Sequence, residues 1–182
     1  MTRVKEALII VDMSNDFVAD EGTLTVGKPA QEIVGYIRNL ADTFLNKGNI
    51  VVIAMDAHIK DDKHFNTWPP HNIIGTKGQE LYGELYEWHK NNLDNNKVLY
   101  QPKQNYNAFF NTDLAEKLRN ENVDTVHIAG VTTDICDFLT VAGADAEGFN
   151  TVIHRRGAAT FTNNGDLMIE HMERCFQTQV IE

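Results

Sequence analysis

Short apolar runs rich in Ile and Val alternate with segments of helical periodicity along this 182-residue chain. The runs cover residues 7–13, 50–55, 98–101, 125–130, 151–154 and, more weakly, 178–181. Between the first two, apolar residues from Ile33 to Leu45 fall on one helical face, with Pro29 suited to the first turn and Gly48 to the C-cap. Further helices are expected at 112–122, 134–147 and 165–176.

Strands that are apolar on both faces and separated by helices form a parallel sheet that is covered on each side. The pattern therefore predicts an α/β fold of three layers, α/β/α, around a parallel sheet of about six strands. A chain of this length fits one domain, and no repeat, linker or low-complexity segment divides it. We expect a single domain over residues 1–182.

One long segment, residues 57–79, shows neither the strand period nor the helix period. Loops of that length inside a compact domain are usually functional or disordered. This one contains three histidines and the sequence Trp-Pro-Pro-His, which favours a functional loop.

The net charge and the cysteine content limit which partners and which cellular compartment are expected. The net charge is −10, with acidic and basic residues mixed along the chain, whereas binding to nucleic acid or to an anionic membrane needs a basic face. We therefore expect neither as a partner. The two cysteines are too few for a disulfide framework, and no apolar stretch resembles a signal peptide or approaches the roughly 20 residues of a membrane span. These features favour a cytoplasmic protein.

Polar side chains gather where the predicted strands end. In open α/β sheets, ligands bind outside the carboxyl ends of the strands. The residues that follow the first four predicted strands include Asp12, Asp16, Phe17, Asp56, His58, Lys103, Thr132, Thr133, Asp134 and Cys136. The candidate chemistry thus converges on one rim of the sheet.

Cys136 lies in the first turn of a predicted helix, where the positive end of the helix dipole favours a thiolate. An adjacent Lys103 would lower the pKa of the thiol further, and Asp12 could accept the thiol proton. The alternatives remain open for each residue. Cys136 could be a small buried apolar residue, Asp12 a capping carboxylate and Lys103 a solvated surface charge.

Asp56 and His58 stand two residues apart on an extended segment and so point the same way. His64 and His71 follow in the same loop, and one carboxylate with three imidazoles suits zinc, iron or manganese. The alternative is a polar loop with incidental histidines. His127 lies in the middle of a predicted strand and is expected to be a core residue.

Two aromatic residues near this rim, Phe17 and Trp68, could form the walls of a pocket for a flat aromatic substrate. Each could equally belong to the core. Trp68, in a polar loop beside two prolines, is the stronger candidate for a wall.

Five motifs occur in order along nearly the whole chain. They are Val-Asp-x-x-Asn-Asp-Phe (11–17), Asp-Ala-His (56–58), Trp-Pro-Pro-His-Asn (68–72), Lys103 ahead of Tyr-Asn-Ala-Phe (106–109), and Gly-Val-Thr-Thr-Asp-Ile-Cys (130–136). Together they resemble the nicotinamidase branch of the isochorismatase-like cysteine hydrolases. The resemblance implies a six-stranded parallel sheet of order 3-2-1-4-5-6, and hydrolysis of nicotinamide to nicotinate and ammonia through a cysteine thioester, in NAD salvage.

The same resemblance implies roles for particular residues. Asp12, Lys103 and Cys136 would form the catalytic triad, and the backbone N–H groups of Thr132 and Cys136 would form the oxyanion hole, with a cis peptide bond just before Thr132. The family's divalent metal, zinc before iron or manganese, would be bound by Asp56, His58, His64 and His71. The substrate ring would lie among Phe17, Trp68 and Tyr106.

Two departures from the family pattern stand out. Ser14 occupies a position where the family often has Gln, and the metal loop is compact, which makes His64 the ligand that the resemblance supports least. Isochorismatases themselves lack the Asp-x-His set, which weakens that alternative.

Three other functions compete with this one. A related cysteine amidase acting on a ureido or carbamoyl compound would share the triad. A nucleotide-binding module fits the fold but lacks a glycine-rich phosphate loop after the first strand. A metal-binding protein without catalysis would not need the triad. Related enzymes form several assemblies, so a homo-oligomer remains open.

Overall fold

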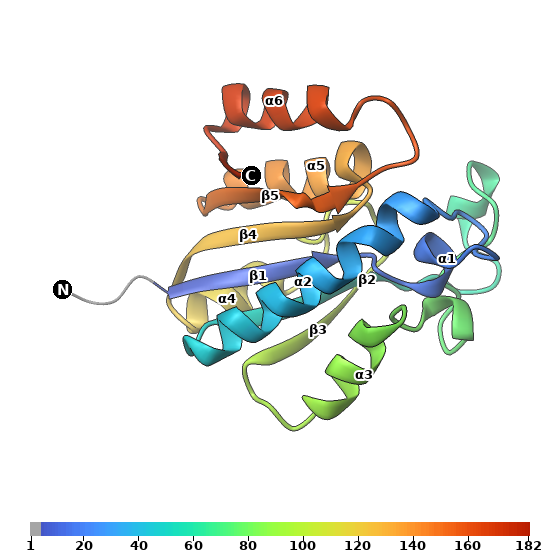
Figure 1. The fold of residues 1–182 in the computed structure, drawn as a ribbon, viewed down its shortest axis with the longest axis horizontal. Coiled ribbons are helices and arrows are strands. Elements are labelled where there is room, and N and C mark those ends of the chain that lie inside the picture. The colour runs from blue at the N-terminus through green and yellow to red at the C-terminus, as the bar shows by residue number, and fades with distance from the viewer. Residues whose placement is uncertain (1–4) are drawn as a thin grey trace.

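A six-stranded parallel sheet forms the centre of the molecule (Figure 1), which is a computed structural model that describes residues 5–182. The strands are β1 (Lys5–Val11), β2 (Ile50–Asp56), β3 (Val98–Lys103), β4 (Val123–Val131), β5 (Asn150–Ala159) and β6 (Gln179–Ile181). Their order across the sheet is β3-β2-β1-β4-β5-β6, and every neighbouring pair is parallel. This confirms the predicted three-layer fold and its strand order.

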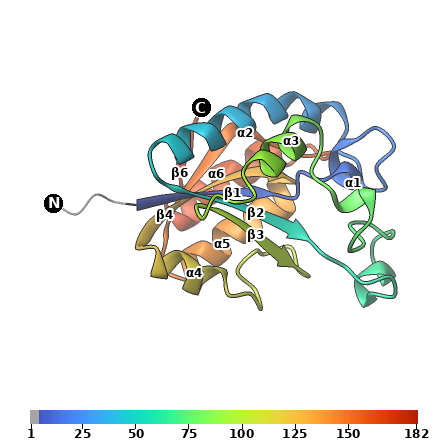
Figure 2. The ribbon, with the colours of Figure 1, turned by 90° about the horizontal axis from the view of Figure 1, so that it is seen from below.

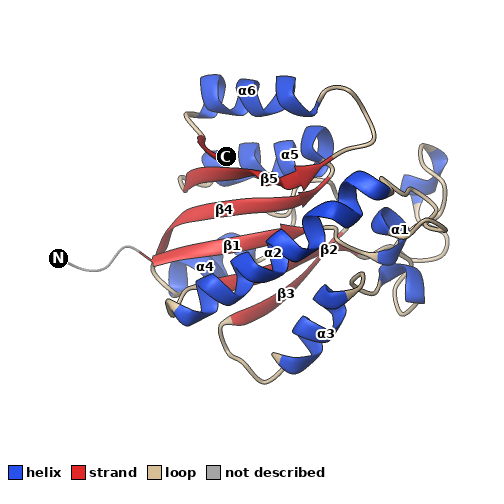
Figure 3. Ribbon diagram, viewed as in Figure 1, coloured by secondary structure: helices blue, strands red, loops and turns tan. Residues whose placement is uncertain are grey.

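Helices cover both faces of the sheet, as the view in Figure 2 and the colouring in Figure 3 show. The helices are α1 (Asn15–Val18), α2 (Lys28–Asn46), α3 (Glu84–Asn91), α4 (Leu114–Asn120), α5 (Phe138–Ala146) and α6 (Gly165–Phe176). The buried side chains of α2 and α3 pack on one face, and those of α4, α5 and α6 pack on the other. Among the described residues, no helix is both long and apolar enough to cross a membrane.

The alternation of side chains along β1 supplies both halves of the core. Ala7, Ile9 and Val11 point to the α4–α5–α6 face, while Leu8 and Ile10 point to the α2–α3 face, and all five are buried. The strand must therefore be apolar throughout, which is why its sequence reads as a continuous apolar run.

The sheet brings the predicted rim residues together. The strand order reverses between β1 and β4, so Asp12, just after β1, and Cys136, just after β4, lie at the switch point of the sheet. On the other side of β1, Asp56 of β2 is aligned with Lys103 of β3. Pro102 is tolerated inside β3 because β3 is an edge strand.

Several elements differ from the predicted ones. β3 extends to Lys103 and β5 to Ala159, beyond the apolar runs that predicted them. The segment before α5, Thr133–Asp137, forms a wide π-helical turn, so Cys136 precedes the α-helix instead of lying within its first turn. The segment 57–79 has no long element, but it contains two short 3₁₀ helices at Lys63–Asn66 and Lys77–Gln79.

Candidate active site

A lysine and two carboxylates form a buried charge cluster at the rim. The Lys103 Nζ donates to Asp12 Oδ2 at 2.7 Å and to Asp56 Oδ1 at 2.5 Å. Asp12 Oδ1 accepts from the backbone N–H of Asp56 at 2.8 Å. The exposed fractions are 0%, 1% and 3% for Asp12, Lys103 and Asp56, so the three groups interact almost without water.

Burial and the neighbouring Asp56 raise the pKa of Asp12 to about 6, although the charge of Lys103 opposes the rise. Burial alone would lower the pKa of Lys103, but the two carboxylates outweigh it and raise that pKa above its usual value. The pKa of Asp56 is lowered by Lys103 and by the nearby imidazoles of His58 and His71, despite burial. The cluster therefore holds a charged lysine, a charged Asp56 and an Asp12 that can gain or lose a proton near neutral pH.

Cys136 is 5% exposed and lines the same pocket as Asp56. Burial raises the pKa of its thiol well above the usual value, Lys103 opposes that rise, and the adjacent Asp12 adds to it. The sequence argument expected the helix end and Lys103 to favour a thiolate, but in the structure burial outweighs them. The resting group is a neutral thiol, and it needs a nearby base to become a nucleophile.

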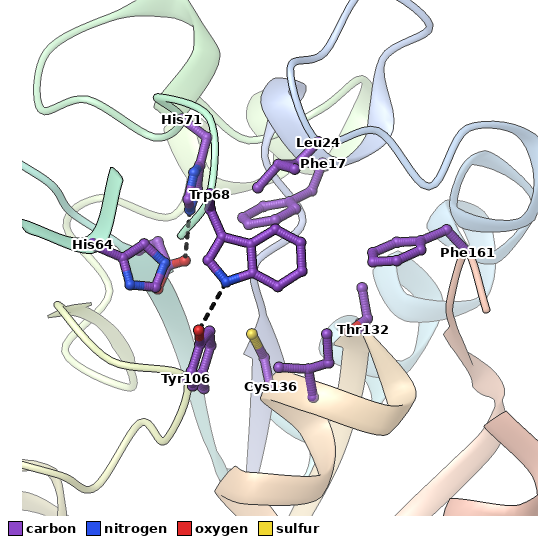
Figure 4. A pocket seen from close by; sticks show the side chains of 11 residues that line it. Phe17, Leu24, His64, Trp68, His71, Tyr106, Thr132, Cys136 and Phe161 are labelled. Carbon is purple, nitrogen blue, oxygen red and sulfur yellow. Dashed lines mark hydrogen bonds and ion pairs between the residues drawn. The ribbon is translucent and has the colours of Figure 1, made fainter. Parts of the chain in front are cut away.

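The pocket beside Cys136 is walled mostly by aromatic side chains (Figure 4). Its lining residues are Phe17, Leu24, Asp56, His64, Trp68, His71, Tyr106, Thr132, Ile135, Cys136 and Phe161. Trp68 Nε1 donates to the Tyr106 hydroxyl at 2.8 Å, which ties the loop 57–79 to the segment after β3. The three predicted walls, Phe17, Trp68 and Tyr106, and both residues of the predicted oxyanion hole therefore share one pocket. The peptide bond between Val131 and Thr132 is cis.

Three histidines of the loop 57–79 converge at one side of this pocket. One ring nitrogen from each of His58, His64 and His71 lies within 4.8 Å of the others. Asp56 Oδ2 lies 3.7 Å from His58 Nε2 and 3.6 Å from His71 Nε2. The four predicted ligands are thus neighbours, with Asp56 shared between the histidines and Lys103.

The outer contacts of these histidines fix which nitrogen faces the cluster. His71 Nδ1 donates to the carbonyl oxygen of Pro69 at 2.7 Å, and His58 Nδ1 lies 2.9 Å from Asp62 Oδ2. His58 Nε2 is buried and has no hydrogen-bond partner among residues 5–182. A buried nitrogen left without a partner, beside two further imidazoles and a carboxylate, fits a divalent metal of the zinc type.

The loop is fastened to the end of β1 by polar contacts around Asn72, which adopts a left-handed conformation with φ 44°. Ser14 Oγ donates to Asn72 Oδ1 at 2.7 Å, and the Asn72 N–H donates to Asp16 Oδ2 at 2.7 Å. Ser14, the departure from the family pattern, therefore helps to hold the segment that carries His71.

Four residues of the site were not among the predicted site residues. Asp62 could have been found from its place four residues after His58, where it caps a 3₁₀ turn. Leu24 and Phe161 reach the pocket from separate loops. Asp137 follows Cys136, is fully buried, has no hydrogen-bond partner among the described side chains and backbone, and has a pKa raised well above its usual value, first by burial.

Comparison with known proteins shows the family of this chain. The family model of the isochorismatase domain matches residues 6–181. A nicotinamidase/pyrazinamidase from Bacillus subtilis is 40% identical, with a TM-score of 0.95 over 98% of this chain and 100% of that chain. A pyrazinamidase from Pyrococcus horikoshii, solved in complex with zinc, is 26% identical, with a TM-score of 0.87 over 98% and 99%.

A member with another named activity is also similar in structure. An N-carbamoylsarcosine amidase from Thermoplasma acidophilum is 28% identical, with a TM-score of 0.84 over 97% of this chain and 95% of that chain. Since the family model spans nearly all of the described residues, this chain belongs to the isochorismatase domain family, and its identity with the Bacillus subtilis protein places it in the nicotinamidase branch.

Proposed function

We propose that this protein is a nicotinamidase, which hydrolyses the carboxamide of nicotinamide to a carboxylate and ammonia. The observation that carries the proposal is the position of Cys136. Its thiol shares one pocket with three aromatic walls and with the histidine cluster, and it lies beside the buried pair of Asp12 and Lys103. The names of two relatives, a nicotinamidase/pyrazinamidase and a pyrazinamidase, support amides of nitrogen-containing aromatic rings as the substrate class.

Asp12 is the base in the proposed first step. With a pKa of about 6 it is mostly ionised at neutral pH, yet basic enough to take the proton of the Cys136 thiol. The resulting thiolate attacks the carboxamide carbon. The N–H groups of Thr132 and Cys136 stabilise the oxyanion, a contribution of about 3–4 kcal/mol for a donor of this kind.

Collapse of this tetrahedral species breaks the carbon–nitrogen bond. Asp12 gives its proton to the leaving nitrogen, so ammonia departs and an acyl thioester remains on Cys136. Asp12 then takes a proton from a water molecule that attacks the thioester, and returns it to the sulfur as the carboxylic acid leaves. Throughout, Lys103 keeps the charge of Asp12 balanced and its oxygens oriented.

The residues that would hold a divalent metal are Asp56, His58, His64 and His71. When bound, the metal supplies a Lewis acid for the ring nitrogen of a pyridine substrate. Zinc is the metal that we propose first, with iron and manganese as alternatives. In the cell, the product would feed pyridine nucleotide salvage in the cytoplasm.

The test is ammonia release from nicotinamide by wild-type protein and by Cys136→Ala, with Cys175→Ala as the matched control, because Cys175 is exposed and does not line the pocket. We expect Cys136→Ala to lose activity on the order of 10³-fold or more, and Cys175→Ala to behave as wild type. Activity should disappear on chelation and return with one of zinc, iron or manganese. Release that survives Cys136→Ala would overturn the mechanism.

A substrate panel tests the substrate class. Nicotinamide, pyrazinamide, benzamide and N-carbamoylsarcosine share a cleavable carbon–nitrogen bond but differ in ring and ring nitrogen. We expect the first two to be hydrolysed well and the ureido compound poorly, because the pocket is walled by Phe17, Trp68 and Tyr106. Preference for the ureido compound would move the protein to the activity of its carbamoyl-cleaving relative.

A further inference from the structure

Phe161 reaches the pocket from the loop after β5 and has no role in the chemistry described above. Its side chain extends toward the pocket from the side opposite His64 and His71, above Thr132 (Figure 4). The residue is 49% exposed, so a large aromatic side chain stands at the pocket without being covered by the core. An apolar ring in that position restricts the space available to a bound molecule.

The two residues on either side of Phe161 hold its loop against the nucleophile's own turn. Thr160 Oγ1 donates to Asp134 Oδ1 at 2.6 Å, and Thr162 Oγ1 donates to Asp134 Oδ2 at 2.5 Å. Asp134 belongs to the π-helical turn Thr133–Asp137 that carries Cys136. One carboxylate therefore fixes Phe161 relative to the sulfur, through two short bonds that flank the aromatic residue.

Each of the two threonine hydroxyls also accepts a hydrogen bond from the backbone of its own loop. Thr160 Oγ1 accepts from the N–H of Thr162 at 3.2 Å, and Thr162 Oγ1 accepts from the N–H of Asn164 at 3.0 Å. At Gly165, an added Cβ would come within 3.2 Å of the Thr160 methyl carbon, so the end of the loop packs closely as well. The loop around Phe161 is thus held at a defined position.

We propose that Phe161 is a specificity-determining residue, and that Asp134, through Thr160 and Thr162, is the positioning residue that sets where its ring stands. The proposal rests on the proposed hydrolysis of pyridine carboxamides. With the ring nitrogen facing the histidines and the carboxamide facing Cys136, the ring edge remote from the nitrogen faces Phe161. The protein therefore accepts rings that are unsubstituted on that edge and discriminates against 5-substituted pyridine carboxamides.

The first experiment measures kcat/KM for nicotinamide and for 5-methylnicotinamide in wild type and in Phe161→Ala. Because one methyl group in a closely fitting pocket changes kcat/KM about 10–200-fold, we expect the ratio of the 5-methyl compound to the parent to rise about tenfold or more in Phe161→Ala. Leu167→Ala is the matched control, since Leu167 is a comparably exposed apolar residue, 58% exposed, that does not line this pocket. An unchanged ratio in Phe161→Ala overturns the proposal.

The positioning role is tested with Thr160→Val/Thr162→Val, which removes both hydroxyls and keeps the size of the side chains. We expect the substrate ratio to move in the direction seen in Phe161→Ala, with a higher KM for nicotinamide and a kcat changed much less. Thr160→Ser/Thr162→Ser keeps the hydroxyls and should retain the wild-type ratio. If the valine variant is poorly folded, Thr162→Val alone serves. A wild-type ratio in folded valine variants would refute the role of Asp134.

A second readout does not depend on the substrate. Iodoacetamide and N-phenyl-iodoacetamide react with Cys136 at the same carbon and differ only in bulk, and the exposed Cys175 is an internal reference in the same protein. We expect Phe161→Ala to raise the rate of the bulky reagent at Cys136 several-fold relative to the small one, with no such change at Cys175. If wild type releases no ammonia from any pyridine amide, the proposed function fails, while this ratio still decides whether Phe161 restricts the pocket.

Discussion

Two groups of buried histidines, one in the loop after β2 and one in the middle of the sheet, contain side chains whose pKa values shift in opposite directions, upward at His58 and downward at His127 and His154. His58, in the loop after β2, lies 2.9 Å from Asp62 Oδ2 and 3.7 Å from Asp56 Oδ2, and these two carboxylates overcome burial and raise its pKa. His127 of β4 and His154 of β5 lie in the middle of the sheet, where burial lowers the pKa of each to about 4. His58 is thus more readily protonated than an ordinary histidine, whereas His127 and His154 are kept neutral in the interior.

The interior pair is organised as a chain of neutral groups. The Tyr36 hydroxyl lies 2.8 Å from His154 Nδ1, and His154 Nε2 lies 2.9 Å from His127 Nδ1. The nearest carboxylate oxygen, from Glu6, is 3.7 Å from His127 Nε2. The pKa values of the two groups therefore differ because carboxylates lie close to His58 at the carboxyl-end rim, whereas none lies within hydrogen-bond distance of the described pair in the middle of the sheet.

The largest expected effect comes from removing a rim histidine. His58→Ala should lose bound metal on dialysis and with it ammonia release, by at least the roughly 100-fold that loss of an outer partner alone can cost. His127→Gln should keep both. Metal content by mass spectrometry, together with ammonia release, checks this. Equal losses of metal and activity in His58→Ala and His127→Gln would mean that the rim and interior histidines do not differ in metal binding.

Acid should destabilise the fold through the interior pair. The unfolded chain binds protons below the ordinary histidine pKa of 6.5, whereas the folded pair does so only near 4. The free energy of unfolding should therefore be steady above about pH 6.5 and fall by about 1.4 kcal/mol per unit for each histidine as the pH drops toward 4. Urea unfolding of wild type and of His127→Gln/His154→Gln measures it, and the variant should show a shallower dependence.

Loss of the Asp62 carboxylate should lower metal affinity less than loss of the His58 side chain. Asp62→Asn keeps the size of the side chain but removes the charge 2.9 Å from His58 Nδ1. We expect metal affinity to fall about 10–100-fold, with ammonia release restored by excess metal. Asp61→Asn is the neighbouring control. An affinity unchanged in Asp62→Asn would mean that this carboxylate does not orient His58.

The smallest expected effect is that of Tyr36→Phe. It leaves the buried His154 Nδ1 without its hydroxyl partner, which should cost about 1 kcal/mol of the free energy of unfolding. Thermal and urea unfolding measure the loss, while metal content and ammonia release should match wild type. A large loss of activity would connect the interior chain to the site, contrary to the contrast drawn above.

Periodicity predicted where most elements of the fold lie, because burial on both faces leaves a clear mark in the sequence. It predicted both ends of α6 and the start of β2. It missed the second half of β5, where Arg155, Arg156 and Gly157 interrupt the apolar run. It also missed α3, which buries only Leu85 and Trp88. The order of the strands came from the family resemblance, since periodicity does not say which strands are neighbours.

The site was predictable where a strand end delivers the side chain. Asp12, Asp56 and Lys103 each stand at such an end, so the rule for open sheets was enough to group them. Phe161 was not predictable in the same way, because its place depends on contacts between segments that only the folded chain brings together. The pKa of Cys136 was misjudged because the extent of burial is a property of the tertiary structure.

The alignment of Asp56 with Lys103 limits how chains of this kind can diverge in length. Neighbouring residues of a strand point to opposite faces, so a shift of β3 by one residue would turn Lys103 away from both carboxylates. An insertion or deletion of one residue inside β3 should therefore break both ion pairs of Lys103, whereas the connection between α3 and β3, residues 92–97, can lengthen at little cost. A change of length is thus tolerated in the connection but not in the strand. The position of Lys103 beside the two carboxylates depends on the register of β3 as well as on the identity of the residue.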